Sequence, residues 1–595
     1  MSSIKRDKRQ ALKGRNVGEL YSSRFFDYYT KGRSDALKAR IASLLLGSPT
    51  DVSYEAFVGH PKPDVQMDVP VYCQHAQLEA LFKKDQDLTS PINQEQAALS
   101  SFFESEESCQ TVNFNLTNGC IPARINGPDA SAILHYAREK IASILGDVPA
   151  LSDLDLSFGP GASTSCRKMT SARYKLSADP SISNSLIANK LLFKELLAEL
   201  PHIAAADTTW RVQPGKLEFV PKNYKTLRSI CLEPTYTSMI QRGVGTLMKQ
   251  KLKRCGIDLY DQSINRDRAR MGSTSEHDYC TIDLERASDS VASQLVAELV
   301  PFEWYDLLSS IRSDFIELPD GSITEIHKFS SMGNGYTFEL ESMIFYALSF
   351  GISRHYNLSF DLTVYGDDIV TNKALADRIL DLFPVFGFSV NVEKSFLDGP
   401  FRESCGFDAL HGIDVRPFFW KDRASFALVT NFYNFLHRKP WFDPSGQIRE
   451  VLINEIPIDC RFFGPDGFGD GHLLTDDDHV PKRSNRLVKN GFGGYHFATI
   501  VAKATTSVVP LPFDYILPAY VAATKDSKEQ GSYLRRNFTI PPVEWIDECH
   551  PLVRDSIKQY NLLFASKRQA ASGDPYSVRS KKITGRWINV YVLDR

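Results

Sequence analysis

The segment Thr363-Val364-Tyr365-Gly366-Asp367-Asp368-Ile369-Val370 places two adjacent carboxylates between two short apolar runs. The apolar runs predict two strands, and Gly366-Asp367 has the composition of a tight hairpin turn. Adjacent carboxylates raise each other's pKa unless a cation neutralises them. Mg²⁺ accepts such hard oxygen ligands and keeps its waters for a phosphate, so the segment predicts a metal site at a hairpin tip. The alternative is a solvated turn in which Asp only favours the bend.

A second acidic segment lies upstream, at residues 279–290. β-Prone residues lead into Asp283 and apolar residues then recur at helical spacing, which predicts a strand that feeds a helix. An acid at the end of an apolar strand is costly when buried alone, and a metal shared with Asp367 and Asp368 would compensate it. Asp289 has two interpretations, because it is placed either to cap the following helix or to face a ligand.

Two further segments fit a phosphate-bearing ligand. The loop Ser330-Ser331-Met332-Gly333-Asn334-Gly335-Tyr336-Thr337 combines glycines with small polar groups at a helix start, although alone it is more typical of a simple turn. Residues 211–254 hold ten Lys or Arg against two Glu, an excess of eight in a chain whose formal net charge is −3. Such an excess suits polyphosphate or a nucleic-acid backbone. The cluster of cations from Lys249 to Arg254 is typical of a solvated helix end.

The order of these segments resembles motifs F, A, B and C of template-dependent RNA polymerases with a right-hand architecture. Several stretches are also similar to the replicase β subunit of single-stranded RNA bacteriophages of the coliphage Qβ type, and the resemblance runs from about residue 144 to 471. The stretches that carry it are Val220-Pro221-Lys222-Asn223, Gly256-Ile257-Asp258-Leu259, Ser331 to Ser342 and Gly399 to Gly406.

The resemblance implies an α+β fold with fingers, palm and thumb, in which an antiparallel palm sheet packs on helices. We expect an N-terminal region that braces the fingers or thumb at 1–140 and fingers with the basic NTP-binding loop at 141–275. The palm with the catalytic motifs is expected at 276–430, and the thumb with the C-terminal region at 431–595.

The implied function is RNA-dependent RNA polymerisation that replicates a viral single-stranded RNA genome by two-metal-ion nucleotidyl transfer. Asp283 and Asp367 would hold two Mg²⁺ ions, for which Mn²⁺ can substitute, and Asp368 would help to position them. Lys394 resembles the motif D lysine and is a candidate general acid towards pyrophosphate, although a surface lysine beside Glu393 is the commoner case. The expected nucleotide-binding residues are Lys222, Lys225, Arg228, Asp289, Ser331, Gly333, Asn334 and Thr337.

Sugar recognition is where this chain departs from the pattern of the class. Many polymerases of this class carry an Asn four residues beyond the motif B Thr, whereas this chain has Glu341 there. Asn334 is therefore a candidate for completing ribose recognition. Five residues separate Asp283 from Asp289, which lets Asp289 face the incoming ribose while Asp283 faces the metals.

Two rival functions share parts of this pattern. A reverse transcriptase would share the strand-end Asp and the hairpin, but it would normally show a Gln-Gly motif B instead of Ser-Met-Gly-Asn-Gly. A non-catalytic RNA-binding protein on a palm-like fold is the other rival, because fold does not dictate function. Retention of all three carboxylates favours an enzyme over the second rival.

Composition and resemblance together suggest where the protein works. The 595 residues are 43% hydrophobic and 24% charged, without a run long enough to span a bilayer or an apolar secretory signal. The ten cysteines lie singly, which is typical of free thiols in a reducing cytoplasm, here that of a bacterial host. The implied partners are RNA template and product, NTPs, host elongation factors Tu and Ts, and an RNA-binding protein of the small ribosomal subunit, with no membrane.

Overall fold

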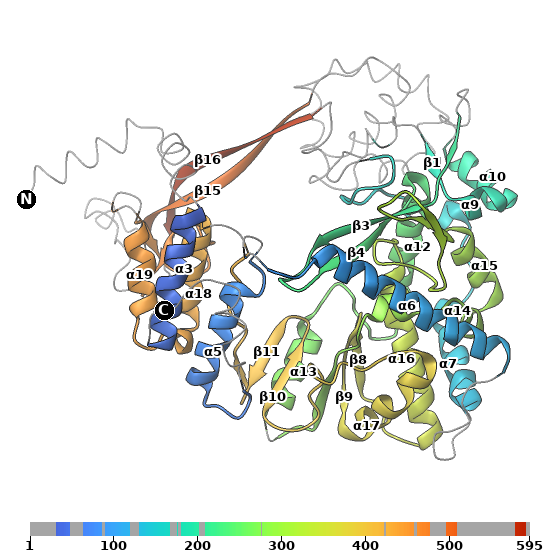
Figure 1. Cartoon of the computed structure of the whole chain (residues 1–595), viewed down its shortest axis with the longest axis horizontal. Coiled ribbons are helices and arrows are strands. Elements are labelled where there is room, and N and C mark those ends of the chain that lie inside the picture. Colours follow the sequence, from blue (N-terminus) through green and yellow to red (C-terminus); the bar gives the residue numbers. More distant parts are fainter. Residues whose placement is uncertain are drawn as a thin grey trace, which may run out of the picture.

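The structure is a computed structural model in which the chain forms two lobes (Figure 1). The large lobe holds the elements from α6 (Gln94–Thr117) to β12 (Ile413–Asp414), and the small lobe is built on α3 (Lys31–Leu46), α5 (Val69–Phe82), α18 (Phe426–Arg438) and α19 (Gln447–Glu455). The residues that the structure describes are 31–47, 64–85, 88, 90–119, 130–166, 175, 180–200, 209–274, 276–421, 424–456, 458, 461–476, 495–508 and 577–590.

Long helices form the core of the large lobe. α16 (Thr337–Tyr356) is buried along nearly its whole length, and apart from Glu339 and Glu341 its buried side chains are mostly apolar or small. It packs against α7 (Ala130–Leu145), and a Cβ at Gly351 would lie 2.5 Å from the Ile133 carbonyl oxygen, so the close approach requires glycine. Around this pair lie α12 (Thr235–Arg254), α14 (Ser293–Leu299), α15 (Phe302–Ser310) and α17 (Lys373–Leu382), with α9 (Asn184–Ala188) and α10 (Lys190–Glu199) further out.

A three-stranded antiparallel sheet lies beside α16. Its strand order is β5-β9-β8, with β5 at Tyr279–Ile282, β9 at Asp368–Asn372 and β8 at Leu362–Tyr365. The expected hairpin is confirmed, because Tyr365 pairs with Asp368 across the Gly366-Asp367 turn. Ile282 pairs with Ile369, so the exit of β5 lies next to the hairpin tip.

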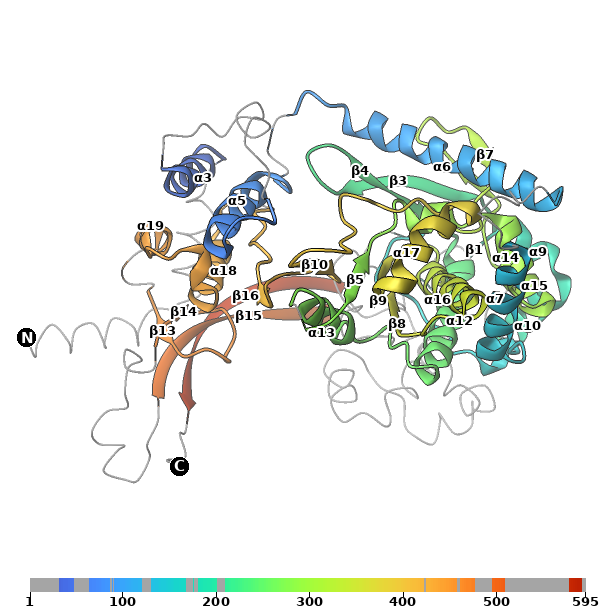
Figure 2. The ribbon, with the colours of Figure 1, turned by 90° about the horizontal axis from the view of Figure 1, so that it is seen from below.

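Two other sheets flank this one. The four-stranded sheet has the order β4-β3-β6-β7, with β4 at Leu227–Leu232, β3 at Gly215–Pro221, β6 at Phe315–Glu317 and β7 at Ile323–Glu325. Figure 2 shows α6 running along β3 and β4. The other sheet, β10 (Phe401–Ser404), β11 (Phe407–Leu410) and β12, packs on α13 (Ser263–Gly272), and a short parallel pair joins β1 (Ser181–Ile182) to β2 (Arg211–Val212).

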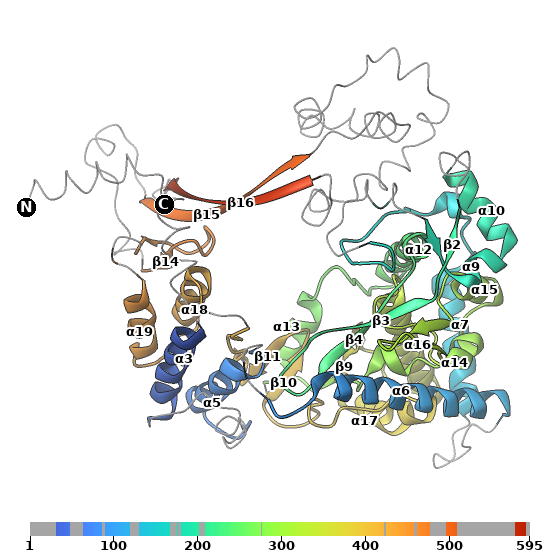
Figure 3. The same ribbon diagram turned by 45° about the horizontal axis from the view of Figure 1, so that its top comes forward.

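The small lobe joins segments that lie far apart in the sequence. α3 and α5 pack with α18 and α19 around the fully buried Trp420 and Phe432, and the Gln77 amide donates a 2.9 Å hydrogen bond to the Phe418 carbonyl. The short strands β13 (Phe463–Gly464) and β14 (Leu473–Leu474) follow. β15 (Tyr495–Val508) pairs with β16 (Ser577–Val590) in a long ribbon that extends from this lobe towards the side of the large one (Figure 3).

The expected domain boundaries stay a prediction. Two of them, at 140/141 and 430/431, lie within the helices α7 and α18. Residue 275, the segment 1–30 and most of the region after 476 lie outside the described residues. Within the described part, no helix is long and apolar enough to cross a membrane, and the seven cysteines there form no disulfide.

Candidate active site

Asp283 and Asp367 come together at adjacent strand ends. Asp283 directly follows β5, and Asp367 stands in the turn between β8 and β9. The structure thus confirms the predicted strand exit and hairpin tip. Burial above all, and then the charges of Asp367 and Glu403, raise the pKa of Asp283 to about 6, although Lys394 opposes them. Burial likewise raises the pKa of Asp367.

Gly366 fixes the shape of the hairpin tip. Its φ of +64° lies in the left-handed region, and a Cβ there would stand 2.3 Å from the Phe338 ring. The Gly366 N–H donates a 3.0 Å hydrogen bond to the Ser342 hydroxyl of α16. The tip that carries Asp367 is therefore tied to the most buried helix of the lobe, and no larger residue fits at position 366 without a shift.

Lys394 and Asn391 hold the Asp283 carboxylate. The Asn391 amide donates to Oδ2 at 2.9 Å, and Lys394 Nζ lies 3.4 Å from the same oxygen. The lysine predicted as a general acid therefore stands at the acidic pair. Burial lowers the pKa of Lys394, but Asp283 and Glu403 outweigh it and the net shift is upward.

Asp368 is held differently from the other two acids. Its Oδ2 accepts a 3.0 Å hydrogen bond from the Cys405 N–H, in the turn between β10 and β11. Burial first, and then Asp367, raise the pKa of Asp368 to about 7. Among the residues that the structure describes, no three His, Cys, Asp or Glu side chains are grouped as a metal site. Asp367 and Asp283 both raise the pKa of Asp368, so the three carboxylates lie within electrostatic reach of one another, and their sharing of ions stays a prediction.

Asp289 is not a helix cap, so that interpretation is wrong. It lies in the 3-10 turn η2 (Ala287–Ser290), while α14 begins only at Ser293 after Ala292. Ala292 first pairs with Lys328 as an isolated β-bridge, which delays the helix. The Asp289 carboxylate instead accepts a 2.8 Å hydrogen bond from Lys328 Nζ. Sequence reasoning missed Lys328, and the one signal available was a lysine between apolar residues, in Ile326-His327-Lys328-Phe329.

The glycine-rich loop packs tightly before α16. The Thr337 hydroxyl donates to the Ser331 carbonyl at 3.1 Å, and the Asn334 side-chain oxygen accepts from the Tyr336 N–H at 3.0 Å. At Gly333, with φ +121°, a Cβ would lie 2.1 Å from the Cys231 carbonyl oxygen. These contacts make the loop a rigid start of the helix.

Three buried polar atoms of this region have no hydrogen-bond partner within the described chain. They are Ser331 Oγ, Asn334 Nδ2 and Glu341 Oε2. Burial raises the pKa of Glu341 well above its usual range, and the charges of Asp367 and Asp289 add to the shift. A buried polar group without a partner costs roughly 1–3 kcal/mol, so the three atoms are suited to a polar ligand.

The basic loop joins β3 to β4. Asn223 accepts hydrogen bonds from the backbone N–H groups of Lys225 at 2.9 Å and Thr226 at 3.0 Å, which shapes the turn. Lys222 and Arg228 act electrostatically on Asp367, in each case lowering a pKa that burial raises. The structure thus brings Lys222 and Arg228 to the acids, whereas Lys225 lies over the Tyr224 ring at 5.6 Å.

The cations near the end of α12 are not simply solvated, in contrast to the expectation. Lys249 forms a 3.0 Å ion pair with the buried Glu339 of α16, and Lys251 donates to the Leu145 carbonyl. Lys253 forms an ion pair with Asp258, and its side chain is largely exposed, as expected for a solvated helix end. Tertiary packing of α12 against α16 and α7 makes the difference.

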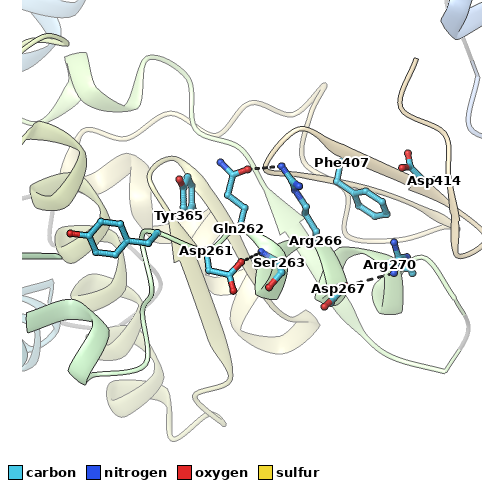
Figure 4. A pocket seen from close by; sticks show the side chains of 10 residues that line it. Asp261, Gln262, Ser263, Arg266, Asp267, Arg270, Tyr365, Phe407 and Asp414 are labelled. Atoms are coloured by element: carbon cyan, nitrogen blue, oxygen red, sulfur yellow. Dashed lines mark hydrogen bonds and ion pairs between the residues drawn. The ribbon is translucent and has the colours of Figure 1, made fainter. Parts of the chain in front are cut away.

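A pocket of about 590 Å³ lies on the β8 side of the hairpin tip (Figure 4). Tyr365, next to the Gly366 turn, forms one wall, and Arg270 stacks over Phe407 at 5.0 Å on another. Sequence reasoning did not find this pocket. The residues that line it are Tyr260, Asp261, Gln262, Ser263, Arg266, Asp267, Arg270, Tyr365, Phe407 and Asp414.

Comparison with known proteins places these features in a family. Residues 33–438 match the family described as RNA replicase, beta-chain. The RNA-directed RNA polymerase subunit beta of Enterobacteria phage SP is 32% identical over 519 residues, which cover 84% of this chain and 82% of that protein. The subunit of the same name from Escherichia virus Qbeta is 34% identical over 423 residues, covering 68% of this chain and 70% of that protein.

Other matches are shorter or more distant. The RNA-directed RNA polymerase beta chain of Escherichia phage MS2 is 38% identical over 263 residues, covering 44% of this chain and 47% of that one. A solved structure of the RNA-dependent RNA polymerase of a human picobirnavirus is 11% identical and covers 59% of this chain and 85% of that chain, with a TM-score of only 0.31. The phage relatives are named as RNA-directed RNA polymerases. None of these three is named as a reverse transcriptase or as a non-catalytic RNA-binding protein, the two rival classes.

Proposed function

The chain belongs to the RNA replicase β-chain family and is an RNA-directed RNA polymerase of the phage type, and from this premise we propose that it replicates a viral single-stranded RNA genome by two-metal-ion nucleotidyl transfer. The convergence of Asp283 and Asp367 at adjacent strand ends, next to the Lys394 ammonium, is the observation that carries the proposal. Acids and cations so arranged suit a reaction between a hydroxyl and a triphosphate.

The donor set at the strand ends fits Mg²⁺, with Mn²⁺ as a substitute. Asp283 and Asp367 offer hard carboxylate oxygens whose charge is disfavoured by burial, so a divalent cation would compensate them. These two residues would hold the ions, and Asp368, anchored on the Cys405 N–H, would help to position them. When bound, two such ions supply Lewis-acid activation of the 3′-hydroxyl and charge compensation for the leaving pyrophosphate.

The cations of the chain act on the triphosphate. Lys222 and Arg228, which act electrostatically on Asp367, neutralise the phosphate oxygens of the triphosphate. The Arg228 guanidinium is able to contact two of these oxygens at once. Lys225 lies further out in the same turn and assists from there. Lys394 remains an ammonium beside Asp283, so it can donate a proton to the leaving pyrophosphate oxygen as the α–β phosphoanhydride bond breaks and the new phosphodiester bond forms.

The polar atoms around the glycine-rich loop recognise the nucleotide. Asp289 accepts a hydrogen bond from the ribose 2′-hydroxyl, either directly or through Asn334, whose amide nitrogen is buried without a partner. Ser331, Gly333 and Thr337 border the nascent base pair. Since a deoxyribose would leave this polar site unpaired, at a cost of about 1–3 kcal/mol, the site prefers NTPs to dNTPs roughly tenfold to over a hundredfold.

The proposed architecture follows from the same positions. The β5-β9-β8 sheet with α16 is the palm, the β3–β4 loop belongs to the fingers, and the small lobe with α18 and α19 is the thumb. The N-terminal region braces two parts, because α3 and α5 pack in the small lobe and α6 packs along β4. RNA and NTPs are the proposed ligands. By similarity to phage β subunits, the proposed host partners are elongation factors Tu and Ts and an RNA-binding protein of the small ribosomal subunit, in the cytoplasm of the bacterial host.

An extension assay tests the proposal. The full-length protein, together with the proposed host partners, is incubated with an RNA template, Mg²⁺ and labelled NTPs or, in parallel, labelled dNTPs. We expect an RNA product that requires NTPs and disappears when EDTA removes the metal. Efficient DNA synthesis would indicate a reverse transcriptase instead, and absence of any product from the folded protein under all these conditions would contradict the polymerase mechanism.

A further inference from the structure

Lys328 is a fully buried lysine at the edge of the candidate active site. Its ammonium lies 2.8 Å from Asp289 Oδ1 and 3.2 Å from Glu106 Oε1, and 4.2 Å from the centre of the Phe102 ring. None of its surface is exposed. The three charges form one cluster that joins the helix α6 to the segment carrying Asp289.

Both the side chain and the backbone of Lys328 are fixed. Glu106 Oε2 accepts hydrogen bonds from the backbone N–H groups of His327, at 2.5 Å, and Lys328, at 3.4 Å. The other oxygen, Oε1, faces the Lys328 ammonium. Lys328 also pairs with Ala292, just after the turn that holds Asp289. The ammonium therefore has one defined position relative to the Asp289 carboxylate.

Compared with well-packed apolar side chains, such a cluster adds little net stability, because desolvating the charges offsets most of their attraction, although removing one partner alone is costly. A geometric role explains it better. The Asp289 side chain keeps 19% of its surface exposed, so Lys328 fixes one carboxylate oxygen while part of the group stays accessible. Without the ammonium, the carboxylate would be free to adopt other rotamers.

We propose that Lys328 is a positioning residue for sugar selection. It orients Asp289 so that the carboxylate meets the 2′-hydroxyl of the incoming nucleotide, and Glu106 holds the lysine in place. The inference rests on the role proposed above for Asp289. It adds a helix of the N-terminal region, α6, to the groups that decide which sugar the polymerase accepts.

The chain offers a matched control in the small lobe. Lys38 is likewise buried between two acids, with its ammonium 3.1 Å from Asp35 and in contact with Asp85. It lies in the other core, away from Asp289. Replacing Lys38 therefore removes the same kind of buried ion pair without touching the sugar site.

The test compares Lys328→Met with Lys38→Met in the full-length protein. For each variant, kcat/KM is measured for an NTP and for the matching dNTP on an RNA template, and thermal unfolding is recorded. We expect Lys328→Met to lower the NTP:dNTP ratio of kcat/KM about tenfold, and Lys38→Met to leave it unchanged. The double variant Lys328→Met/Glu106→Gln removes one charge of each sign, so it keeps the test usable if the single variant unfolds.

Asp289→Asn separates the two proposals. If this variant loses sugar preference while both Lys328 variants keep it, Lys328 is structural and the inference is overturned, but the role of Asp289 stands. If Asp289→Asn itself keeps the wild-type ratio, the ribose role and the inference fall together. A lowered ratio in Asp289→Asn and in either Lys328 variant supports both.

Discussion

Carboxylates in the two lobes meet opposite environments. In the large lobe, burial raises the pKa of Asp283 to about 6 and of Asp368 to about 7. In the small lobe, a two-pronged contact from Arg438, at 2.7 and 2.9 Å, lowers the pKa of Asp466 to about 2. Asp466 is exposed, whereas Asp443 of the same lobe is buried and accepts hydrogen bonds from the Ile448 N–H at 3.1 Å and the Arg449 N–H at 3.0 Å.

The difference separates acids kept for chemistry from acids that stabilise the fold. Asp283 and Asp367 are held close together and only partly compensated, an arrangement that costs stability and leaves oxygens available to a cation. The small-lobe acids already have cations or N–H groups as partners. Substitutions should therefore have opposite effects in the two lobes, and four experiments test this contrast.

The largest expected effect is that of Asp367→Asn on catalysis. The variant loses a negative ligand of the proposed metal site, so elongation should fall by about a thousandfold or more. Its thermal stability should be equal to or above that of the wild type, because a buried repulsion with Asp283 is removed. Single-nucleotide extension and circular dichroism measure the two outcomes. Near-normal elongation by the folded variant in Mg²⁺ would refute the site.

The opposite pattern is expected for Lys38→Met in the small lobe. Removing the Lys38 ammonium breaks its buried ion pair with Asp85 and should cost about 3–5 kcal/mol of unfolding free energy. Elongation per folded molecule should stay unchanged. The control is Lys83→Met, whose exposed pair with Glu79 should contribute less than about 1 kcal/mol. Equal urea midpoints for the two variants would contradict the contrast.

A third effect concerns pH. Burial raises the pKa of Glu233 to about 7 from its ordinary 4.5, so the folded chain binds more protons than the unfolded chain between these values. The contribution of Glu233 to the free energy of unfolding is therefore fully present below pH 4.5. It decreases by up to about 3 kcal/mol as the pH rises to about 7. Glu233→Gln should flatten the profile. Asp466, with its lowered pKa, should give the reverse, a loss as pH falls below 4. Urea unfolding from pH 4 to 8 tests the first, and an unchanged slope in Glu233→Gln would reject it.

The smallest expected effect distinguishes two cations of one turn. Arg228 acts electrostatically on Asp367, whereas Lys225 lies over the Tyr224 ring, so Arg228→Ala should raise KM for NTPs about tenfold and Lys225→Ala less. Steady-state kinetics is the measurement. Salt-titrated RNA binding provides the control, since loss of a template contact weakens binding and flattens its salt dependence. Unchanged NTP kinetics with weaker RNA binding in both variants would indicate that the turn contacts the template and not the triphosphate.

Local pattern was sufficient for the elements that carry the acids. Turn chemistry at Gly366-Asp367 and apolar runs on both sides predicted the β8–β9 hairpin, and β-prone residues predicted the strand that ends before Asp283. Local pattern failed at Asp289, because the β-bridge between Ala292 and Lys328 delays the helix. That bridge joins residues 36 positions apart, so it cannot be predicted from the residues close to Asp289 in the sequence.

Residue types and spacing were enough to predict the family, the order of the motifs and the candidate acids. The tertiary structure was needed to show how the acids are held, with Asp283 on Asn391 and Lys394, and Asp368 on the Cys405 N–H. It alone placed Lys328 between Asp289 and Glu106, residues that lie 39 and 222 positions away in the chain. The physical reason is that burial and charge pairing arise from packing between distant segments, and they set which ionisable groups are left available to a ligand.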